Sequence, residues 1–202
     1  TVASGDTVFI GEKNVNLNQV FNGTEAVTEA GGVLVYYSSV TGGATDRTGT
    51  IQKSIPVNNP DKFELTATDF GSLTGQWYAF NKSSELDYTV LGDSFGSVLV
   101  QKPTVNLDVK LAGYTDSVNG KSVTRNGQIA FELEHNLGIE GTPFKIDIEV
   151  TTPSGGKLTT FGENLKDITL KDQKVIKGAI SLEGREAGTY TAIAKWPSSS
   201  DF

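Results

Sequence analysis

The chain has 202 residues, 24 of them acidic and 17 basic, so its formal net charge is −7, and it contains no Cys, no Met and one His. This length allows one large or two small domains, and 37% hydrophobic residues suffice for their cores. The composition excludes disulfide frameworks, thiol catalysis and Cys-type zinc sites, and one His is too few for an ordinary transition-metal site. Lys and Arg are scattered singly, so no nucleic-acid partner is expected.

No apolar run approaches the roughly 20 residues that a membrane helix requires, so no membrane span is expected. Val, Ile and Thr are abundant and there are 23 glycines, a mixture that favours strands joined by turns over helices. Apolar residues alternate with polar ones in several short runs, which is typical of half-buried strands. The sequence therefore predicts an all-β protein.

The predicted strands follow one another at intervals of about ten residues, a spacing typical of β-sandwiches. In the first half they are residues 7–10, 14–18, 33–39, 50–57, 63–67, 75–80, 88–91 and 97–101. In the second half they are residues 105–111, 128–134, 144–151, 158–161, 167–171, 175–182 and 189–196. Residues 18–30 show the best helical pattern but contain Gly23, so we expect a loop with at most one helical turn. The run from Pro153 to Gly156 predicts a hairpin loop.

A break between two modules is predicted near Lys102, where a strand ends and Pro103 follows. We therefore expect two tandem β-sandwich modules, residues 1–102 and 103–202. Residues 68–78 and 182–190 share a layout, an acidic turn with Gly and then an aromatic residue on a strand. In immunoglobulin-like sandwiches this layout fits the corner at which an aromatic side chain anchors the crossing between sheets. The second module is expected to be immunoglobulin-like.

The residues that could carry chemistry have structural interpretations. His135 is interpreted as an exposed residue at a strand end, because nothing near it in the sequence would orient a general base. No G-x-S-x-G elbow is present, and no catalytic residue is assigned. Acidic residues available for carboxylate-pair chemistry alternate with apolar neighbours, which indicates a solvated strand face; they are Asp87, Asp93, Glu132, Glu134, Asp147 and Glu149.

No cofactor and no metal ligand is assigned from the sequence. Calcium is the one ion that stays open, since it needs only clustered oxygen ligands, although no D-x-D-x-D-G loop is present. The triplets that begin at Asn22 and Asn81 satisfy the N-x-[ST] rule for N-glycosylation. Both lie at predicted loops or strand ends, so we predict Asn22 and Asn81 as glycosylation sites whose side chains face solvent.

Six stretches along the chain carry a family resemblance; they are residues 5–12, 15–17, 69–78, 103–111, 120–131 and 187–192. They resemble the surface-layer glycoproteins of archaea, especially those of methanogens. The first two are similar to the mature start of these proteins, and the later ones resemble, in order, a corner, the start of the second module, a strand entry and a strand. The chain also begins at Thr1 rather than Met, as it would after removal of a secretory signal peptide or after trimming for expression.

The resemblance implies an extracellular, non-catalytic structural protein of the cell surface, often N-glycosylated, that self-associates into a lattice or binds other envelope proteins. The chain ends at residues 197–202 without an apolar helix, which leaves its mode of anchoring open. A carbohydrate- or surface-binding adhesin module is the alternative, because function cannot be read from a sandwich fold. Adjacent aromatic pairs, Tyr36-Tyr37 and Trp77-Tyr78, would support it if one member of each pair faces outward to stack on sugars.

Overall fold

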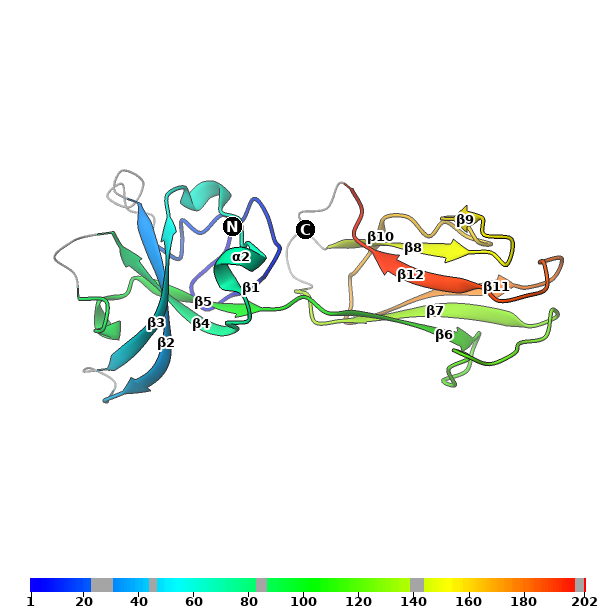
Figure 1. The fold of residues 1–202 in the computed structure, drawn as a ribbon, viewed down its shortest axis with the longest axis horizontal. Helices are drawn as coiled ribbons and strands as arrows, with labels where there is room; N and C mark the ends of the chain where they lie inside the picture. The colour runs from blue at the N-terminus through cyan, green and yellow to red at the C-terminus, as the bar shows by residue number, and fades with distance from the viewer. Residues whose placement is uncertain (23–30, 44–46, 83–86, 139–143, 199–201) are drawn as a thin grey trace. The chain divides into compact units, whose positions relative to one another are not determined.

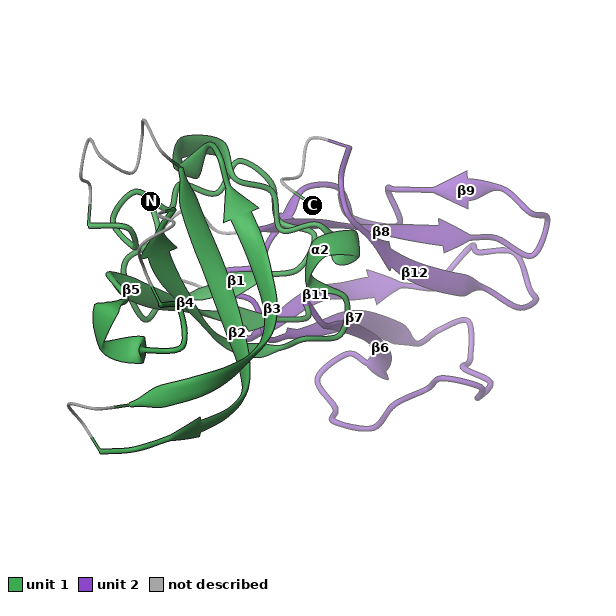
Figure 2. Cartoon of the chain, turned by 60° about the vertical axis from the view of Figure 1, so that its left-hand side comes forward, with its two compact units in different colours: residues 1–102, 201–202 green, residues 103–200 purple. Residues whose placement is uncertain are grey.

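The structure is a computed structural model that describes residues 1–22, 31–43, 47–82, 87–138, 144–198 and 202. Its regular structure is almost entirely β (Figure 1), which confirms the predicted all-β class. The chain divides into two compact units (Figure 2): Thr1–Lys102 with Asp201–Phe202 form unit 1, and Pro103–Ser200 form unit 2. Each unit has its own hydrogen-bonded sheets.

Unit 1 contains one five-stranded sheet in the order β1-β5-β4-β2-β3, with β1 parallel to β5 and the other pairs antiparallel. Its strands are β1 (Thr7–Phe9), β2 (Gly32–Thr41), β3 (Thr48–Val57), β4 (Gly75–Asn81) and β5 (Gly96–Gln101). Its helices are single turns: η1 (Pro60–Lys62), α2 (Ala67–Phe70) and η2 (Leu91–Asp93). In the described part of unit 1, segments without strand structure cover the faces of this sheet.

Alternation along β2 supplies two apolar clusters, one on each face of the sheet. Leu34 contributes to the larger core, which also holds Trp77, Val98 and Val100 from neighbouring strands. Non-strand residues complete this core; they are Ile10, Val15, Leu17, Val20, Phe21, Leu65 and Phe70. Val33, Val35 and Tyr37 point the other way and pack with Phe80 and Leu91 in a smaller cluster. Because both faces are apolar, this sheet is buried on both sides near its centre.

Some predicted strands of unit 1 are shorter or absent. In residues 14–18 and 63–67, Val15 and Phe63 form only an isolated bridge to each other. The prediction that Ala67 belongs to a strand is wrong, because Thr66 caps α2 by accepting a hydrogen bond from the Asp69 backbone N–H at 3.0 Å. Residues 88–91 likewise form only one bridge, between Val90 and Thr48. Apolar alternation indicated the buried positions Val15, Leu17 and Leu65 correctly, but Ala67 is exposed, and the pattern did not indicate the hydrogen-bonding partners.

Residues 17–22 make the expected helical turn, in which the Phe21 backbone N–H donates to the Leu17 carbonyl at 3.2 Å. The remainder of the segment 18–30 lies outside the described residues from 23 onward.

Unit 2 contains two sheets, one in the order β11-β7-β6 and the other in the order β10-β8-β12, with β9 also paired to β8. The strands are β6 (Val105–Leu111), β7 (Gln128–His135), β8 (Lys145–Thr151), β9 (Lys157–Leu158), β10 (Ile168–Thr169), β11 (Lys174–Ser181) and β12 (Thr191–Lys195). Burial alternates along β8, whereas the central strand β7 is buried at consecutive residues from 129 to 133. The apolar residues of one face of each strand are Ile129, Phe131, Leu133, Ile146, Ile148 and Val150. These two inward faces give unit 2 its sandwich-like core.

The turn between β8 and β9 is the hairpin loop that the sequence predicts. Val150 lies opposite Leu158, and the Thr152 backbone N–H donates to the Gly156 carbonyl at 2.8 Å. Gly155 has φ +85°, a conformation that glycine adopts without a steric penalty. The strands beyond it are shorter than predicted, because β9 and β10 have two residues each.

We predict that Trp77→Ala strongly destabilises unit 1. The side chain is 0% exposed, so its removal should lower the free energy of unfolding by about 3–5 kcal/mol. Urea denaturation followed by circular dichroism measures this loss. Trp196→Ala is the matched control and should cost less, because Trp196 is only half-buried and follows the end of β12. Wild-type stability of Trp77→Ala would contradict the packing described here.

Candidate functional site

The corner before β4 holds the largest buried side chain of unit 1. Trp77 Nε1 donates a hydrogen bond to the Leu73 carbonyl, four residues earlier, at 3.3 Å. Its ring packs edge-on against Phe70 with centroids 4.8 Å apart and against Tyr36 at 5.2 Å. The short helix α2 places Phe70 there, and the Gly71 N–H ends this helix by donating to the Ala67 carbonyl. The indole therefore ties the corner to the core.

Unit 2 has a corner of the same kind before β12. The Tyr190 hydroxyl donates to the Glu186 carbonyl, again four residues earlier, at 2.9 Å. Its ring contacts Phe161 with centroids 5.5 Å apart, and the Arg185 guanidinium lies 4.2 Å from the centre of the Phe161 ring. The two stretches paired in the sequence thus share one device, in which an aromatic residue donates from a late strand to the backbone behind it. This contact matches the tyrosine corner of immunoglobulin-like sandwiches.

The adjacent aromatic pairs of unit 1 do divide between the two faces of the sheet. Tyr37 and Tyr78 occupy the face opposite Trp77, but Tyr37 is buried, and its ring meets that of Tyr78 edge-on at 5.5 Å. The Tyr37 hydroxyl donates to the Tyr88 carbonyl. Burial, with smaller effects from Tyr78 and Asp87, raises the pKa of Tyr37 above its ordinary value. Tyr37 is therefore part of the second apolar cluster and does not offer an open ring face for stacking.

The interpretation of His135 as an exposed residue is wrong. His135 is buried because it continues the inward-facing series of odd-numbered residues along β7. Its Nδ1 accepts a hydrogen bond from the Leu137 N–H at 3.2 Å, and Nε2 lies 2.6 Å from the Asp172 carbonyl. A ring that accepts at Nδ1 carries its proton on Nε2, so it donates to Asp172. The imidazole thus joins the end of β7 to the segment before β11.

The acidic residues of β7 take part in a chain of ion pairs across the outer face of its sheet. The interpretation of a solvated face is wrong for Glu132, because its side chain is only 10% exposed between its lysine partners. Glu132 Oε1 lies 2.6 Å from Lys110 Nζ on β6 and 3.2 Å from Lys174 Nζ on β11. Lys174 also pairs with Glu134 at 2.7 Å. The hydrogen bond from Lys110, and a smaller contribution from Lys174, lower the pKa of Glu132. Each cation bridges two strands, so these charges hold the three-stranded sheet together.

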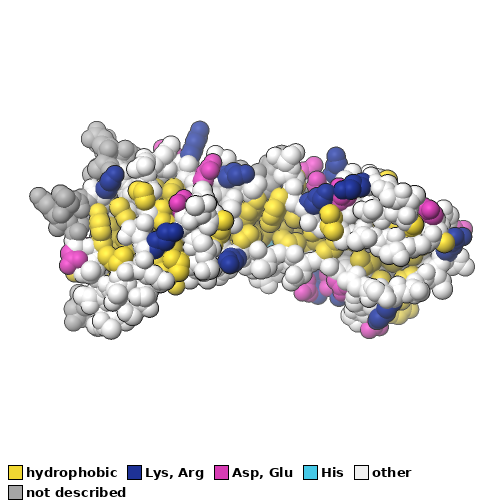
Figure 3. All heavy atoms as spheres, in the orientation of Figure 1, with side chains coloured by type: hydrophobic (Ala, Val, Ile, Leu, Met, Phe, Trp, Pro, Cys, Tyr) yellow, Lys and Arg dark blue, Asp and Glu magenta, His cyan; other side chains and the backbone are white. Residues whose placement is uncertain are grey.

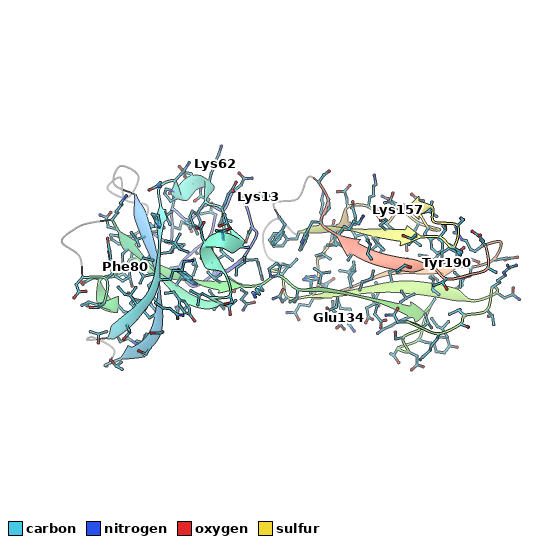
Figure 4. The ribbon with its side chains drawn as sticks, viewed as in Figure 1. Lys13, Lys62, Phe80, Glu134, Lys157 and Tyr190 are labelled. Atoms are coloured by element: carbon cyan, nitrogen blue, oxygen red, sulfur yellow. The ribbon has the colours of Figure 1, made fainter. Side chains whose placement is uncertain are left out.

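The other sheet carries a second set of ion pairs. Glu149 on β8 pairs with Lys195 of β12 at 2.8 Å and with Lys157 of β9 at 3.1 Å. Both lysines lower the pKa of Glu149, Lys195 more strongly. Glu134 and Lys157 mark the two sheets in Figure 4, and Figure 3 shows basic and acidic side chains interspersed over the visible face.

The remaining candidate carboxylates lie apart from these pairs. Asp87 accepts hydrogen bonds from the Thr89 hydroxyl at 2.7 Å and from its N–H at 3.0 Å, which lowers the Asp87 pKa. Asp93 ends η2, and Asp147 accepts from the Asp167 N–H at 2.7 Å. Within the described ranges, no three His, Cys, Asp or Glu side chains are grouped so that they could hold a metal ion. The same residues include no helix that is both long and apolar enough to cross a membrane.

The two predicted glycosylation sites differ in their surroundings. Asn22 is exposed and has φ +63°. Asn81 is half-buried at the end of β4, opposite Gly32, and its side-chain Oδ1 is shielded from solvent with no hydrogen-bond partner in the described part of the chain. The expectation of a solvent-facing side chain therefore describes Asn22 but not Asn81, because the pairing of β4 with β2 continues to this last residue.

A cavity in unit 2, with a volume of about 680 Å³, contains groups that sequence reasoning missed. It is lined by residues 162–163, 178–181 and 183–185, which include Glu163, Glu183 and Arg185. A register shift between Gly178 and Ile180 interrupts the pairing of β11 with β7 at its wall. The sequence gives little indication of this cavity, because its residues are distributed over three segments and only the fold brings them together.

The fold and these contacts define an all-β chain of two compact units. A family model described as "Domain of unknown function (DUF3821)" matches residues 4–201, so the chain belongs to the DUF3821 family. Comparison with curated proteins and with solved structures finds no match.

We predict that Glu132→Gln weakens the acid dependence of stability. Because the folded-state pKa of Glu132 is below its ordinary value of 4.5, the stability from its charged form is complete above about pH 4.5 and is lost as the pH falls through the folded pKa. The variant should be less stable at pH 7 and should lose less stability on acidification. Chemical denaturation at a series of pH values measures both effects.

Glu186→Gln is the matched control, since Glu186 is an exposed residue of unit 2 whose side chain has no ion-pair partner among the described residues. Its stability curve should follow that of the wild type. If Glu132→Gln also followed the wild-type curve at all pH values, the ion pairs of β6, β7 and β11 would contribute nothing to stability.

Proposed function

We propose that this protein is a non-catalytic structural building block of an archaeal cell envelope, a module of a surface-layer lattice. The observation that carries the proposal is that several of its aromatic, histidine and acidic side chains bind other parts of the same chain. Trp77 and Tyr190 tie corners to the backbone, both ring nitrogens of His135 contact backbone groups, and Glu132 and Glu149 bridge neighbouring strands. These side chains serve to hold strands together.

The strand order supports an immunoglobulin-like interpretation of unit 2. In that fold strands A, B and E share one sheet with D, and strands C and F belong to the other. Here β6, β7 and β11, the first, second and sixth strands of unit 2, form one sheet, while β8 and β12, the third and seventh, are neighbours in the other. This match assigns β11 to strand E and β12 to strand F, whereas the short strands β9 and β10 both pair with β8, so that no described strand takes the place of D. Tyr190 then stands at the corner where a tyrosine is expected. Such sandwiches are frequent in cell-surface proteins, which agrees with the extracellular location that the resemblance implies.

The charge of the molecule suits a protein that remains dispersed until copies meet. A net charge of −7 produces mutual repulsion between copies, and interspersed lysines and acids leave local pairs available at a contact. Divalent cations between acidic surfaces would lower this repulsion, because carboxylate oxygens are ligands that calcium prefers. Self-association into a lattice, or binding to other envelope proteins, is therefore the proposed activity.

We predict that the purified full-length protein forms ordered sheets when calcium is added. Negative-stain electron microscopy before and after addition of the ion, and again after chelation, measures this assembly. Sheets that appear with calcium and disperse with the chelator are the expected result, because the cation offsets the negative charge. Protein that stays monomeric at all concentrations tested would instead favour the adhesin alternative.

We also predict that Asn22 is glycosylated in the native host and that Asn81 is modified less or not at all. Asn22 is exposed, whereas the Asn81 side chain is partly enclosed in the sheet. Mass spectrometry of peptides from native envelopes should show added mass on the Asn22 peptide that is absent from protein made in an ordinary bacterial host. An unmodified Asn22 peptide from native envelopes would contradict this prediction.

A further inference from the structure

The cavity of unit 2 is bounded by polar groups of both charge signs. Glu163 and Glu183 supply carboxylates, and Arg185 supplies a guanidinium. Lys177, next to the cavity on β11, lies 3.7 Å from Glu163 Oε2. Two acids and two bases give this group a formal charge near zero. A site of this kind selects neither a strong anion nor a strong cation, because each would meet like charges as well as opposite ones.

Arg185 presents a donor group that the protein itself holds in position. Its guanidinium stacks on the Phe161 ring at 4.2 Å, and Phe161 is in turn packed against Tyr190 at the anchored corner. Among the described residues the guanidinium has no hydrogen-bond or ion-pair partner. A planar group with several N–H donors, fixed in this way, is prepared to bind two neighbouring oxygen atoms at little entropic cost.

Glu163 supplies acceptor capacity on the same cavity wall. Its side chain is 34% exposed, and its Oε2 atom lies 3.7 Å from Lys177 Nζ, which is longer than a hydrogen bond. A carboxylate oxygen in this position can still accept a hydrogen bond from a ligand donor. Arg185 thus offers donors, while Glu163 and Glu183 offer acceptors, in one space.

The cavity wall is constrained by glycines that cannot easily be replaced. A Cβ atom on Gly162 would lie 2.8 Å from Ile180 Cγ2, and one on Gly178 would lie 2.6 Å from the Ile129 carbonyl oxygen. Both have positive φ, +82° and +134°, which other residues rarely adopt. The local backbone therefore requires residues without side chains, and the space beside Arg185 is a consequence of the fold.

We propose that this cavity is a binding site for a neutral saccharide. A sugar hydroxyl both donates and accepts hydrogen bonds, so adjacent hydroxyls satisfy Arg185 as acceptors and the glutamates as donors. A carboxylate ligand would be attracted by Arg185 and Lys177 but repelled by Glu163 and Glu183. The volume of about 680 Å³ lies in the range of small-molecule sites. This inference goes beyond the proposed structural role and does not depend on it.

An array of neutral and uronic-acid oligosaccharides, probed with the labelled full-length chain from a bacterial host, tests the site. We expect binding to neutral members, with affinity reduced about tenfold or more by Glu163→Gln and by Arg185→Met, since each removes hydrogen bonds to a charged group. Arg125→Met and Glu186→Gln are matched controls on exposed residues of unit 2 outside the cavity, and both should bind as the wild type does.

Circular dichroism melting curves of every variant show whether it is folded, so that a loss of binding can be distinguished from unfolding. Glu163→Gln is nearly isosteric and provides the decisive comparison if Arg185→Met disturbs the stacking on Phe161. Absence of binding to any neutral oligosaccharide would overturn the proposal, as would equal binding by wild type and a folded Glu163→Gln variant. Preference for the uronic-acid members would also overturn it, because the acids of the cavity would then not determine its selectivity.

Discussion

Both units depend on a hydrogen bond that an aromatic side chain donates to a carbonyl four residues earlier. Trp77 makes it to Leu73 and Tyr190 makes it to Glu186. The contact fixes where the strand begins, because the ring must enter the apolar layer while its polar atom stays with the preceding turn. The chain has no cysteine, so no disulfide can link its loops to its core. The hydrogen bond and the packing of the ring make this connection, which disulfides make in many small extracellular domains.

The charged side chains of unit 2 depend on the register of its strands. Glu132 reaches both Lys110 and Lys174 because β7 is the central strand of its sheet, and Glu149 reaches Lys157 and Lys195 because β8 is flanked on both sides. A slip of one residue would turn each of these carboxylates toward the core. The ion pairs and the apolar faces therefore specify the same register, which gives a surface of nearly balanced local charge.

The proposed structural role and the proposed saccharide site use different parts of this arrangement. The outer faces of the sheets carry the ion pairs, whereas the cavity lies where the pairing of β11 with β7 is interrupted between Gly178 and Ile180. β-Bulges are frequent next to active sites, because the extra residue is not paired with the neighbouring strand and its side chain can point in a new direction. Arg185 remains available there since its guanidinium is held by an aromatic face instead of by a carboxylate.

The sequence by itself determined the all-β class, the hairpin at residues 153–156 and the inward faces of β7 and β8, because alternation and turn residues act locally. The corner alignment also came from local spacing. Tertiary structure alone decided that Phe63 forms a bridge to Val15, that His135 is buried, and that Asn81 is partly enclosed. It also brought Glu163 and Arg185 to one cavity. Each of these features depends on a partner that is distant in sequence. Alternation of apolar and polar residues predicts on which face of a strand a side chain lies, but it does not predict which segment packs on that face.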